Sequence, residues 1–312
     1  METRPYGTTG RTTSIIGLGG AFLTASSFAD GVATVRRALD LGVTYFDTSP
    51  MYCRGASQAV LGEALEGVTS DCLLATKLGY FSEPLRFHSL DALLTQFGEN
   101  LRLLRRDHVD ILQLHEADSH HWWSTDTALS GRLDKSTDYE FASAPALAAM
   151  SQIKQQGACS FVGISGNTAD NMQRVLEHID VDTFLLAFNY DLIRRGARRV
   201  LPIAEKKGMA RMVGAIFQRG LASSQPTFFD TPPVWMTPKL LEAYRTVYGL
   251  QEQSGMTFAE IGVRFMVAQS EMNVIIIGAK SPDEIEECVR AAEAGPLPPE
   301  MVEQIEQIGL ET

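Results

Sequence analysis

The chain has 312 residues, of which 45% are hydrophobic, and a formal net charge of −11 at pH 7. This length suffices for a large buried core, and the acidic balance argues against nucleic-acid partners, whose binding proteins carry basic patches. No segment approaches the roughly 20 apolar residues of a membrane span, and the polar N-terminus lacks the apolar core of a signal peptide. The four cysteines stand far apart, so we expect reduced thiols and a cytoplasmic protein without a disulfide or zinc site.

Short apolar runs alternate with longer amphipathic segments along the chain. The runs are rich in Val, Ile and Leu with little polar alternation, which is typical of strands buried on both faces. We expect strands at residues 14–18, 43–47, 72–76, 109–114, 161–165, 183–187, 209–216 and 273–277. Between them, apolar residues at helical spacing predict helices at residues 30–41, 89–104, 144–156, 171–178, 198–207 and 281–292.

This alternation of strand and helix predicts a parallel sheet. About eight such units fit a closed (β/α)8 TIM barrel better than an open doubly wound sheet, and no GxGxxG follows the first strand. We therefore predict one α/β barrel domain over residues 1–312. Residues 116–141 break the regularity, because they form a polar segment too long for an ordinary connection after the fourth inner strand. In a barrel, such a loop faces the active site.

Four polar residues stand at or just beyond strand ends, where a barrel builds its active site. Asp47 ends one predicted strand and Tyr52 follows five positions later, while Lys77 and His115 end the next two strands. A free tyrosine has a pKa of about 10, and a nearby ammonium is expected to lower that pKa toward neutrality. A carboxylate would keep the lysine charged, and a histidine could hold a substrate oxygen. The four residues together indicate general acid–base catalysis.

Each of these residues alone is weak evidence. A lone aspartate at a strand end is more often a turn former or a helix cap, a lone lysine is usually solvated, and lone tyrosines and histidines usually pack. An aldolase that forms a Schiff base on Lys77 also stays open, although Asp47 as a neighbour would oppose the lowered lysine pKa that this chemistry needs.

The segments GVTYFDTSPMY, LLATK and HVDILQLHE resemble signatures of the aldo-keto reductase family, and the order Asp, Tyr, Lys, His matches as well. GISGNT, FQRGLA and IIIGAKSPDEIEECV fall where that family has further motifs, so the similarity covers nearly the whole chain. The resemblance implies an NAD(P)-dependent oxidoreductase. It makes Tyr52 the general acid/base, with Lys77 and Asp47 tuning it and His115 orienting the carbonyl.

The resemblance also implies a nicotinamide cofactor that extends across the barrel mouth without a Rossmann fold. The residues that it assigns to the cofactor are Gly20, Asp47, Ser165, Gly166, Asn167, Phe217, Gln218, Arg219, Gly220, Gly278, Lys280, Ser281, Glu284 and Glu287. Asp47 and Ser165 are expected near the nicotinamide, residues 217–220 around the pyrophosphate, and residues 278–287 around the adenosine. Ser281 is also typical of a helix N-cap, whose helix N-terminus favours anions, and the alternative is a plain loop and cap.

The sequence departs from the family at four cofactor positions: Gly166 for Asn, Ala187 for Gln, Gly214 for an aromatic residue and Cys288 for Asn. Relatives that prefer NADP often place an arginine near Glu284, whose carboxylate should repel a 2′-phosphate. Lys280 acts in the opposite sense, since a lysine can meet phosphate as a point charge. We therefore expect NAD or NADP, with a slight preference for NAD.

Two features indicate a small-molecule carbonyl or sugar substrate and a role in carbohydrate metabolism. DTSPMY is similar to the form in family members that act on sugars, and Trp122 and Trp123 could stack on sugar rings. The alternative is that this pair pins the 116–141 loop to the barrel or makes a subunit contact. His120 and His121 have no third ligand nearby in the sequence, so no metal is expected.

Three further points stay open in the sequence. Cys53 lines the pocket or fills a small apolar space. Residues 223–238 are a candidate flap, and the aromatic residues Phe217, Phe228, Phe229 and Trp235 could cover the cofactor or form a homo-oligomer interface. The alternative function is a cofactor-binding regulatory subunit with little turnover, against which the four catalytic residue types argue.

Overall fold

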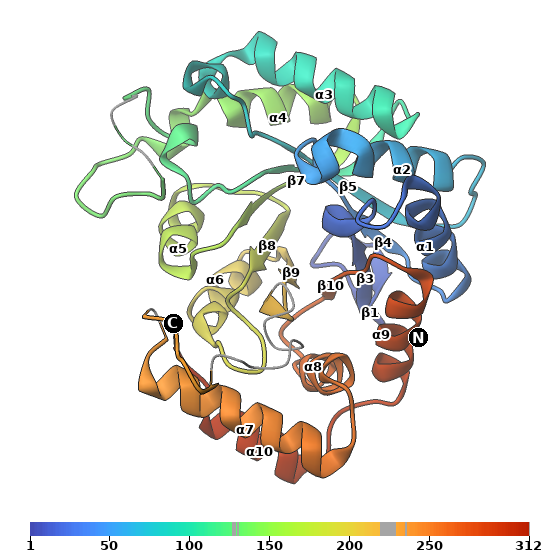
Figure 1. Ribbon diagram of the computed structural model, residues 1–312. Coiled ribbons are helices and arrows are strands. Elements are labelled where there is room, and N and C mark those ends of the chain that lie inside the picture. The colour runs from blue at the N-terminus through green and yellow to red at the C-terminus, as the bar shows by residue number, and fades with distance from the viewer. Residues whose placement is uncertain (127–128, 130, 219–228, 235, 312) are drawn as a thin grey trace.

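A computed structural model shows a closed barrel of eight parallel strands with helices around it (Figure 1). The structure describes residues 1–126, 129, 131–218, 229–234 and 236–311. The barrel order is β10-β3-β4-β5-β6-β7-β8-β9, so each strand pairs with the next barrel strand along the chain and the last closes on the first. The predicted (β/α)8 fold is confirmed.

Each barrel strand corresponds to a predicted one. Their bounds are β3 (Ile16–Gly19), β4 (Tyr45–Asp47), β5 (Leu73–Leu78), β6 (Val109–Leu114), β7 (Cys159–Gly166), β8 (Thr183–Ala187), β9 (Ala210–Gly214) and β10 (Val274–Gly278). The helices are α1 (Phe28–Asp40), α2 (Ala56–Ala64), α3 (Leu90–Leu104), α4 (Pro145–Gln155), α5 (Ala169–His178), α6 (Leu201–Lys206), α7 (Pro238–Ser254), α8 (Phe258–Val267), α9 (Pro282–Glu293) and α10 (Pro299–Gln307).

The strands lack polar alternation because both of their faces are buried. The outer side chains of the strands pack against the helices in one apolar cluster. The inner side chains form a second apolar cluster inside the barrel, which includes Tyr45, Ala75, Ile111, Met212 and Val274. A barrel interior filled by side chains is a packed core and leaves the chemistry to the strand ends.

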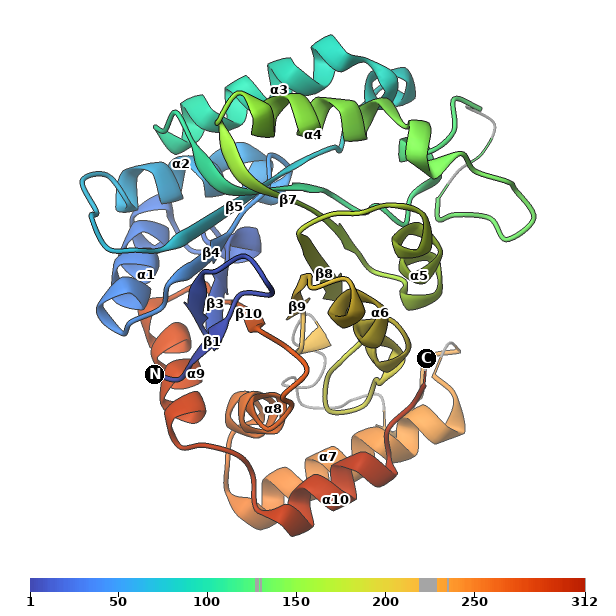
Figure 2. The ribbon, with the colours of Figure 1, turned by 180° about the vertical axis from the view of Figure 1, so that it is seen from behind.

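An N-terminal hairpin that the sequence did not predict closes one end of the barrel (Figure 2). Its strands are β1 (Thr3–Pro5) and β2 (Thr12–Ser14). Tyr6, in the turn between them, is fully buried within the interior cluster, with its ring centroid 5.8 Å from that of Tyr45. The hairpin therefore forms the floor, and the carboxyl ends of the strands form the opposite mouth.

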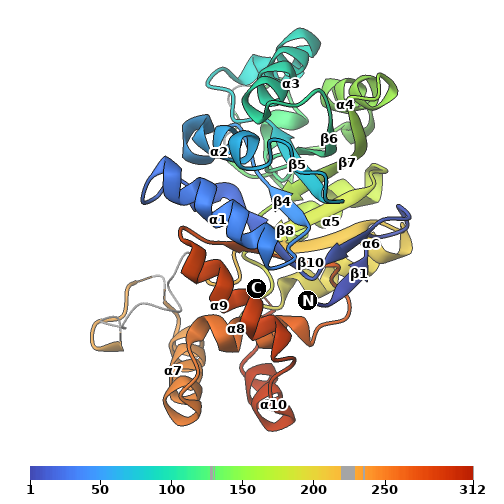
Figure 3. The ribbon, with the colours of Figure 1, turned by 90° about the vertical axis from the view of Figure 1, so that its right-hand side faces the viewer.

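In the described part of the chain, four α-helices were not predicted, namely α2, α7, α8 and α10. α7 and α10 lie beside one another on the outside of the barrel (Figures 1 and 3). N-cap signals precede two of them, because Thr237 accepts from Leu240 N and Thr257 accepts from Glu260 N. Within the described residues, no helix combines the length and apolar character needed to cross a bilayer.

Candidate active site

Backbone strain is concentrated at the mouth of the barrel. In the described part of the chain, the non-glycine residues with φ between 49° and 61° are Cys53, Arg54, Tyr80, Arg105, Glu116, Phe188, Ala215 and Gln218. All of them except Arg105, which ends helix α3, follow the carboxyl end of a barrel strand. Such strain costs about 1–3 kcal/mol per residue and clusters at functional sites, so we place the candidate active site here.

A buried ion pair lies at the mouth. Lys77 Nζ is 2.5 Å from Asp47 Oδ1 and donates to the carbonyl of Thr48 at 2.8 Å. The side chains of Lys77 and Asp47 are 0% and 3% exposed. Neighbouring strands bring them together, because β4 pairs with β5. Burial raises the pKa of Asp47 and lowers the pKa of Lys77, and their mutual attraction opposes both shifts.

Tyr52 packs against this ion pair. It opens the short 3-10 helix η2 (Tyr52–Gly55), and Lys77 Nζ lies 4.7 Å from the centroid of its ring. Burial, followed by the charges of Asp47 and Glu116, raises the pKa of Tyr52 well above its ordinary value. The expectation that Lys77 lowers this pKa is therefore wrong, because Asp47 offsets the ammonium and desolvation of the phenolate dominates. A raised pKa favours the protonated hydroxyl of Tyr52 at neutral pH.

His115 completes the group. Its ring meets that of Tyr52 edge to face at 5.4 Å, and its Nδ1 is 2.8 Å from Ser49 Oγ. Ser49 Oγ accepts from the N–H of Met51 at 3.2 Å, so its own proton is available for Nδ1. With the Ser49 hydroxyl as the donor to Nδ1, the ring proton lies on Nε2. Burial, with the charges of Lys77 and Arg132, lowers the pKa of His115 well below its ordinary value, so the ring is neutral and can donate from Nε2.

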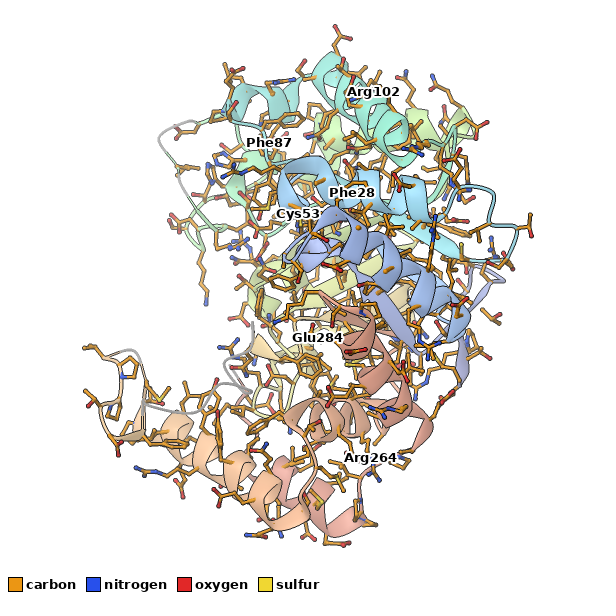
Figure 4. All side chains as sticks on the ribbon, turned by 45° about the vertical axis from the view of Figure 1, so that its right-hand side comes forward. Phe28, Cys53, Phe87, Arg102, Arg264 and Glu284 are labelled. Carbon is orange, nitrogen blue, oxygen red and sulfur yellow. The ribbon has the colours of Figure 1, made fainter. Side chains whose placement is uncertain are left out.

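Trp122 and Trp123 do not face a substrate, which corrects their assignment as substrate-binding residues. They are 0% and 6% exposed, and their indole N–H groups donate to the carbonyls of His115 at 2.9 Å and Ala117 at 2.7 Å. Trp122 also packs edge to face on Phe87 at 4.8 Å (Phe87 is labelled in Figure 4). Burial leaves no ring face for a sugar. Trp122 ties the 116–141 segment to the end of β6, and Trp123 bonds and packs within the segment itself.

Residues that the sequence analysis missed surround His115. The ring of Tyr80 lies 4.6 Å from that of His115, and Arg132 lies within 3.2 Å of Glu116. Tyr80 and Glu116 each stand just beyond a strand end, which is the one signal that could have found them. Arg132 comes from the 116–141 segment, and no pattern in the sequence of that segment predicts that it lies beside Glu116.

The residues expected at the nicotinamide end fit a ribose and an amide. Asp47 Oδ2 is buried and has no hydrogen-bond partner in the described structure, so it can accept from a hydroxyl. Ser165 is 4% exposed and donates to the carbonyl of Leu114 at 3.1 Å, which leaves its lone pairs to accept from an amide. Asn167 is less available, because its amide donates to Glu116 at 2.7 Å.

Two glycines and a cysteine at the mouth are in close contact with neighbouring residues. A Cβ on Gly166 would collide with Met172, which explains why the asparagine usual in relatives is absent. A Cβ on Gly20 would collide with Ser57, and the Cys53 thiol lies 3.4 Å from the carbonyl of Ala21 in η1 (Gly20–Phe22). Cofactor contacts by the backbones of both glycines stay predictions.

The residues expected at the adenosine end stand at the start of α9. Ser281 caps this helix by accepting from Glu284 N at 3.3 Å. Glu284, labelled in Figure 4, accepts from Lys280 N at 3.0 Å and lies 3.3 Å from Lys280 Nζ. Gly278 precedes them at the exposed end of β10. Glu287 instead accepts from Thr257 Oγ1 at 2.5 Å, which ties α9 to α8.

The expected pyrophosphate loop is described only at its start. Gln218 donates to Asp191 Oδ1 at 2.8 Å and accepts from the hydroxyl of Tyr244, so its side chain is committed inside the protein. Phe217 packs near Gly262. Arg219, Gly220, Phe228 and Trp235, with most of the candidate flap, lie outside the described residues.

A closed (β/α)8 barrel with a buried Asp–Lys pair, a tyrosine and a neutral histidine at its mouth defines a barrel oxidoreductase. The sequence model of the aldo/keto reductase family matches residues 15–309, and the chain belongs to this family. The family uses NAD(P)(H), and the protein is an NAD(P)-dependent oxidoreductase. Family membership argues against the aldolase alternative, as does the pairing of Lys77 with Asp47.

Similar proteins include sugar dehydrogenases. The chain is 29% identical over 304 residues to L-galactose dehydrogenase of Arabidopsis thaliana, covering 93% of this chain and 88% of that protein. It is 25% identical over 233 residues to D-threo-aldose 1-dehydrogenase of a Pseudomonas species, covering 66% of each. The structure of an aldo-keto reductase from Bacillus halodurans in its holo form superimposes with a TM-score of 0.77 at 23% identity, over 100% of this chain and 97% of that one.

Proposed function

We propose that this protein transfers hydride between NAD(P)(H) and a sugar or sugar-derived carbonyl or alcohol, with Tyr52 as the general acid/base. The observation that carries the proposal is the Asp47–Lys77 pair, 2.5 Å apart and buried against the ring of Tyr52, with the neutral His115 on the same ring. The two sugar dehydrogenases among the similar proteins support the substrate class.

The bound cofactor supplies or accepts the hydride at its nicotinamide ring. In the direction of reduction, His115 Nε2–H holds the substrate carbonyl oxygen, and the Tyr52 hydroxyl gives that oxygen its proton. Lys77 stabilises the phenolate that remains, and Asp47 keeps Lys77 charged and oriented. In the direction of oxidation, the phenolate of Tyr52 takes the proton of the substrate hydroxyl. Proton transfer of this kind contributes about 10²–10⁴-fold to the rate.

We also propose a preference for NAD over NADP. Lys280, the cation that could attract a 2′-phosphate, already pairs with Glu284 at 3.3 Å. The Glu284 carboxylate also accepts from the Lys280 N–H, so the start of α9 presents an acidic group close to where the adenosine is expected. A phosphate there would meet repulsion instead of a free cation.

The test is reduction of NAD⁺ and NADP⁺ by a panel of neutral aldoses, with aldehyde and ketone reduction measured alongside. We expect turnover of at least one aldose, with kcat/KM about tenfold higher for NAD⁺, the effect of one unfavourable charge contact. Cofactor binding without turnover of any compound would favour the regulatory-subunit alternative. Absence of cofactor binding would refute the proposal.

A further inference from the structure

Two strained residues flank His115 at the mouth. Tyr80 follows β5 with a φ of 58°, and Glu116 follows β6 with a φ of 53°. Gly79, which precedes Tyr80, has a φ of 123°. The side chain of Gln96 in α3 hydrogen-bonds to both the N–H and the carbonyl of Gly79 at 2.8 Å. Because the surroundings enforce these conformations, the placement of Tyr80 and Glu116 is a built feature of the site.

Tyr80 contacts His115, and the charge of Glu116 affects Tyr52. The Tyr80 ring meets His115 at 4.6 Å and remains 42% exposed. Glu116 directly follows His115, and its charge adds to that of Asp47 in raising the pKa of Tyr52. Burial and a hydrogen bond to Glu116 also raise the pKa of Tyr80. A negative charge at Glu116 is therefore felt where a substrate oxygen would be protonated.

The nearby arginine is already engaged. Arg132 NH1 lies 2.8 Å from Asp118 Oδ1 and 3.2 Å from Glu116 Oε2. Asp118 is fully buried and also accepts from the N–H of Asn167 at 3.0 Å, whereas the Glu116 side chain is 26% exposed. One guanidinium thus serves two carboxylates. Glu116 also accepts from the Asn167 amide at 2.7 Å, and it is the carboxylate with surface left for a ligand.

We propose, on the basis of the proposed function, that Glu116 is a specificity-determining residue that selects uncharged polyhydroxy substrates. Its carboxylate accepts a hydrogen bond from a substrate hydroxyl and repels substrates that carry a phosphate or a carboxylate close to the reacting carbon. A charged acceptor makes the stronger hydrogen bond, and repulsion of the wrong substrate adds to discrimination.

The test compares reduction of glyceraldehyde with that of glyceraldehyde 3-phosphate in wild type, Glu116→Gln and Asp138→Asn. Asp138 is an exposed acid of the same 116–141 segment and serves as the matched control. We expect wild type and Asp138→Asn to favour glyceraldehyde by about tenfold in kcat/KM, as for one partly screened charge contact. In Glu116→Gln the ratio should fall to about threefold or less. In this variant the KM for glyceraldehyde 3-phosphate should fall, and the KM for glyceraldehyde should rise.

Far-UV circular dichroism reports folding, and the spectrum of Glu116→Gln should match that of wild type. Equal rates for the two substrates in wild type, or a preference for the phosphate through Arg132, overturn the inference while the proposed function stands. Retention of the wild-type ratio by Glu116→Gln overturns it as well. If wild type reduces neither these nor other aldoses, the proposed function fails and this inference fails with it.

Discussion

Tyr52 has two charged neighbours, Lys77 and Asp47. Lys77 faces its ring and Asp47 neutralises Lys77, so the group as a whole presents little net charge to the phenol. Desolvation then decides the pKa, and the tyrosine stays protonated at neutral pH. This suits carbonyl reduction, where an acid is needed, and makes the opposite direction dependent on pH.

We expect oxidation of an alcohol substrate to accelerate as the pH rises. The raised pKa of Tyr52 keeps the phenolate scarce, and its fraction increases about tenfold per pH unit below that pKa. The reductive rate should stay flat over the same interval, since the phenol remains protonated. Profiles of kcat/KM in both directions between about pH 6 and pH 9 measure this. An oxidative profile without slope would contradict the assignment of Tyr52 as the base.

Among the elements, the 116–141 segment is tied to the end of β6 by Trp122. Trp122 and Trp123 donate to carbonyls two residues apart, those of His115 and Ala117, so only Trp122 holds the carbonyl of His115. The ring of Trp122 also fills the space above Gly79, where a Cβ would stand 2.8 Å from Trp122 Cζ2. The segment therefore positions the histidine from outside the barrel.

Trp122→Phe and Trp123→Phe form a matched pair. Each removes one indole N–H and leaves a buried carbonyl without its donor, which costs about 1–3 kcal/mol of unfolding free energy. Both variants should lose stability by this amount in urea unfolding, whereas only Trp122→Phe should lower kcat/KM, because only it releases His115. Equal kinetic effects in the two variants would show that Trp122 has no special relation to the site.

For the molecule as a whole, periodicity predicted the barrel, and the strand ends predicted which polar residues meet at its mouth. Eight buried strands have no polar alternation, and Asp47, Lys77 and His115 converge because neighbouring parallel strands end at one mouth. The floor hairpin was missed because its segment is polar and rich in glycine and threonine, and only packing around Tyr6 reveals it.

Other errors concern burial and charge compensation, which depend on three-dimensional neighbours. Sequence cannot show that Trp122 is sealed inside or that Asp47 offsets Lys77 at 2.5 Å, so the tryptophan role and the direction of the Tyr52 pKa were wrong. The pairing of Arg132 with Glu116 and Asp118 joins residues 14–16 positions apart across an irregular segment, where no periodic pattern applies.

The most direct measurement is a single-turnover assay of Tyr52→Phe, following nicotinamide absorbance after mixing the enzyme–cofactor complex with substrate. Phenylalanine keeps the ring that faces Lys77 and removes the hydroxyl group whose proton is transferred. We predict that hydride transfer slows by about 10²–10⁴-fold while the cofactor Kd stays at the wild-type value. Hydride transfer at close to the wild-type rate in this variant would show that Tyr52 is not the acid/base.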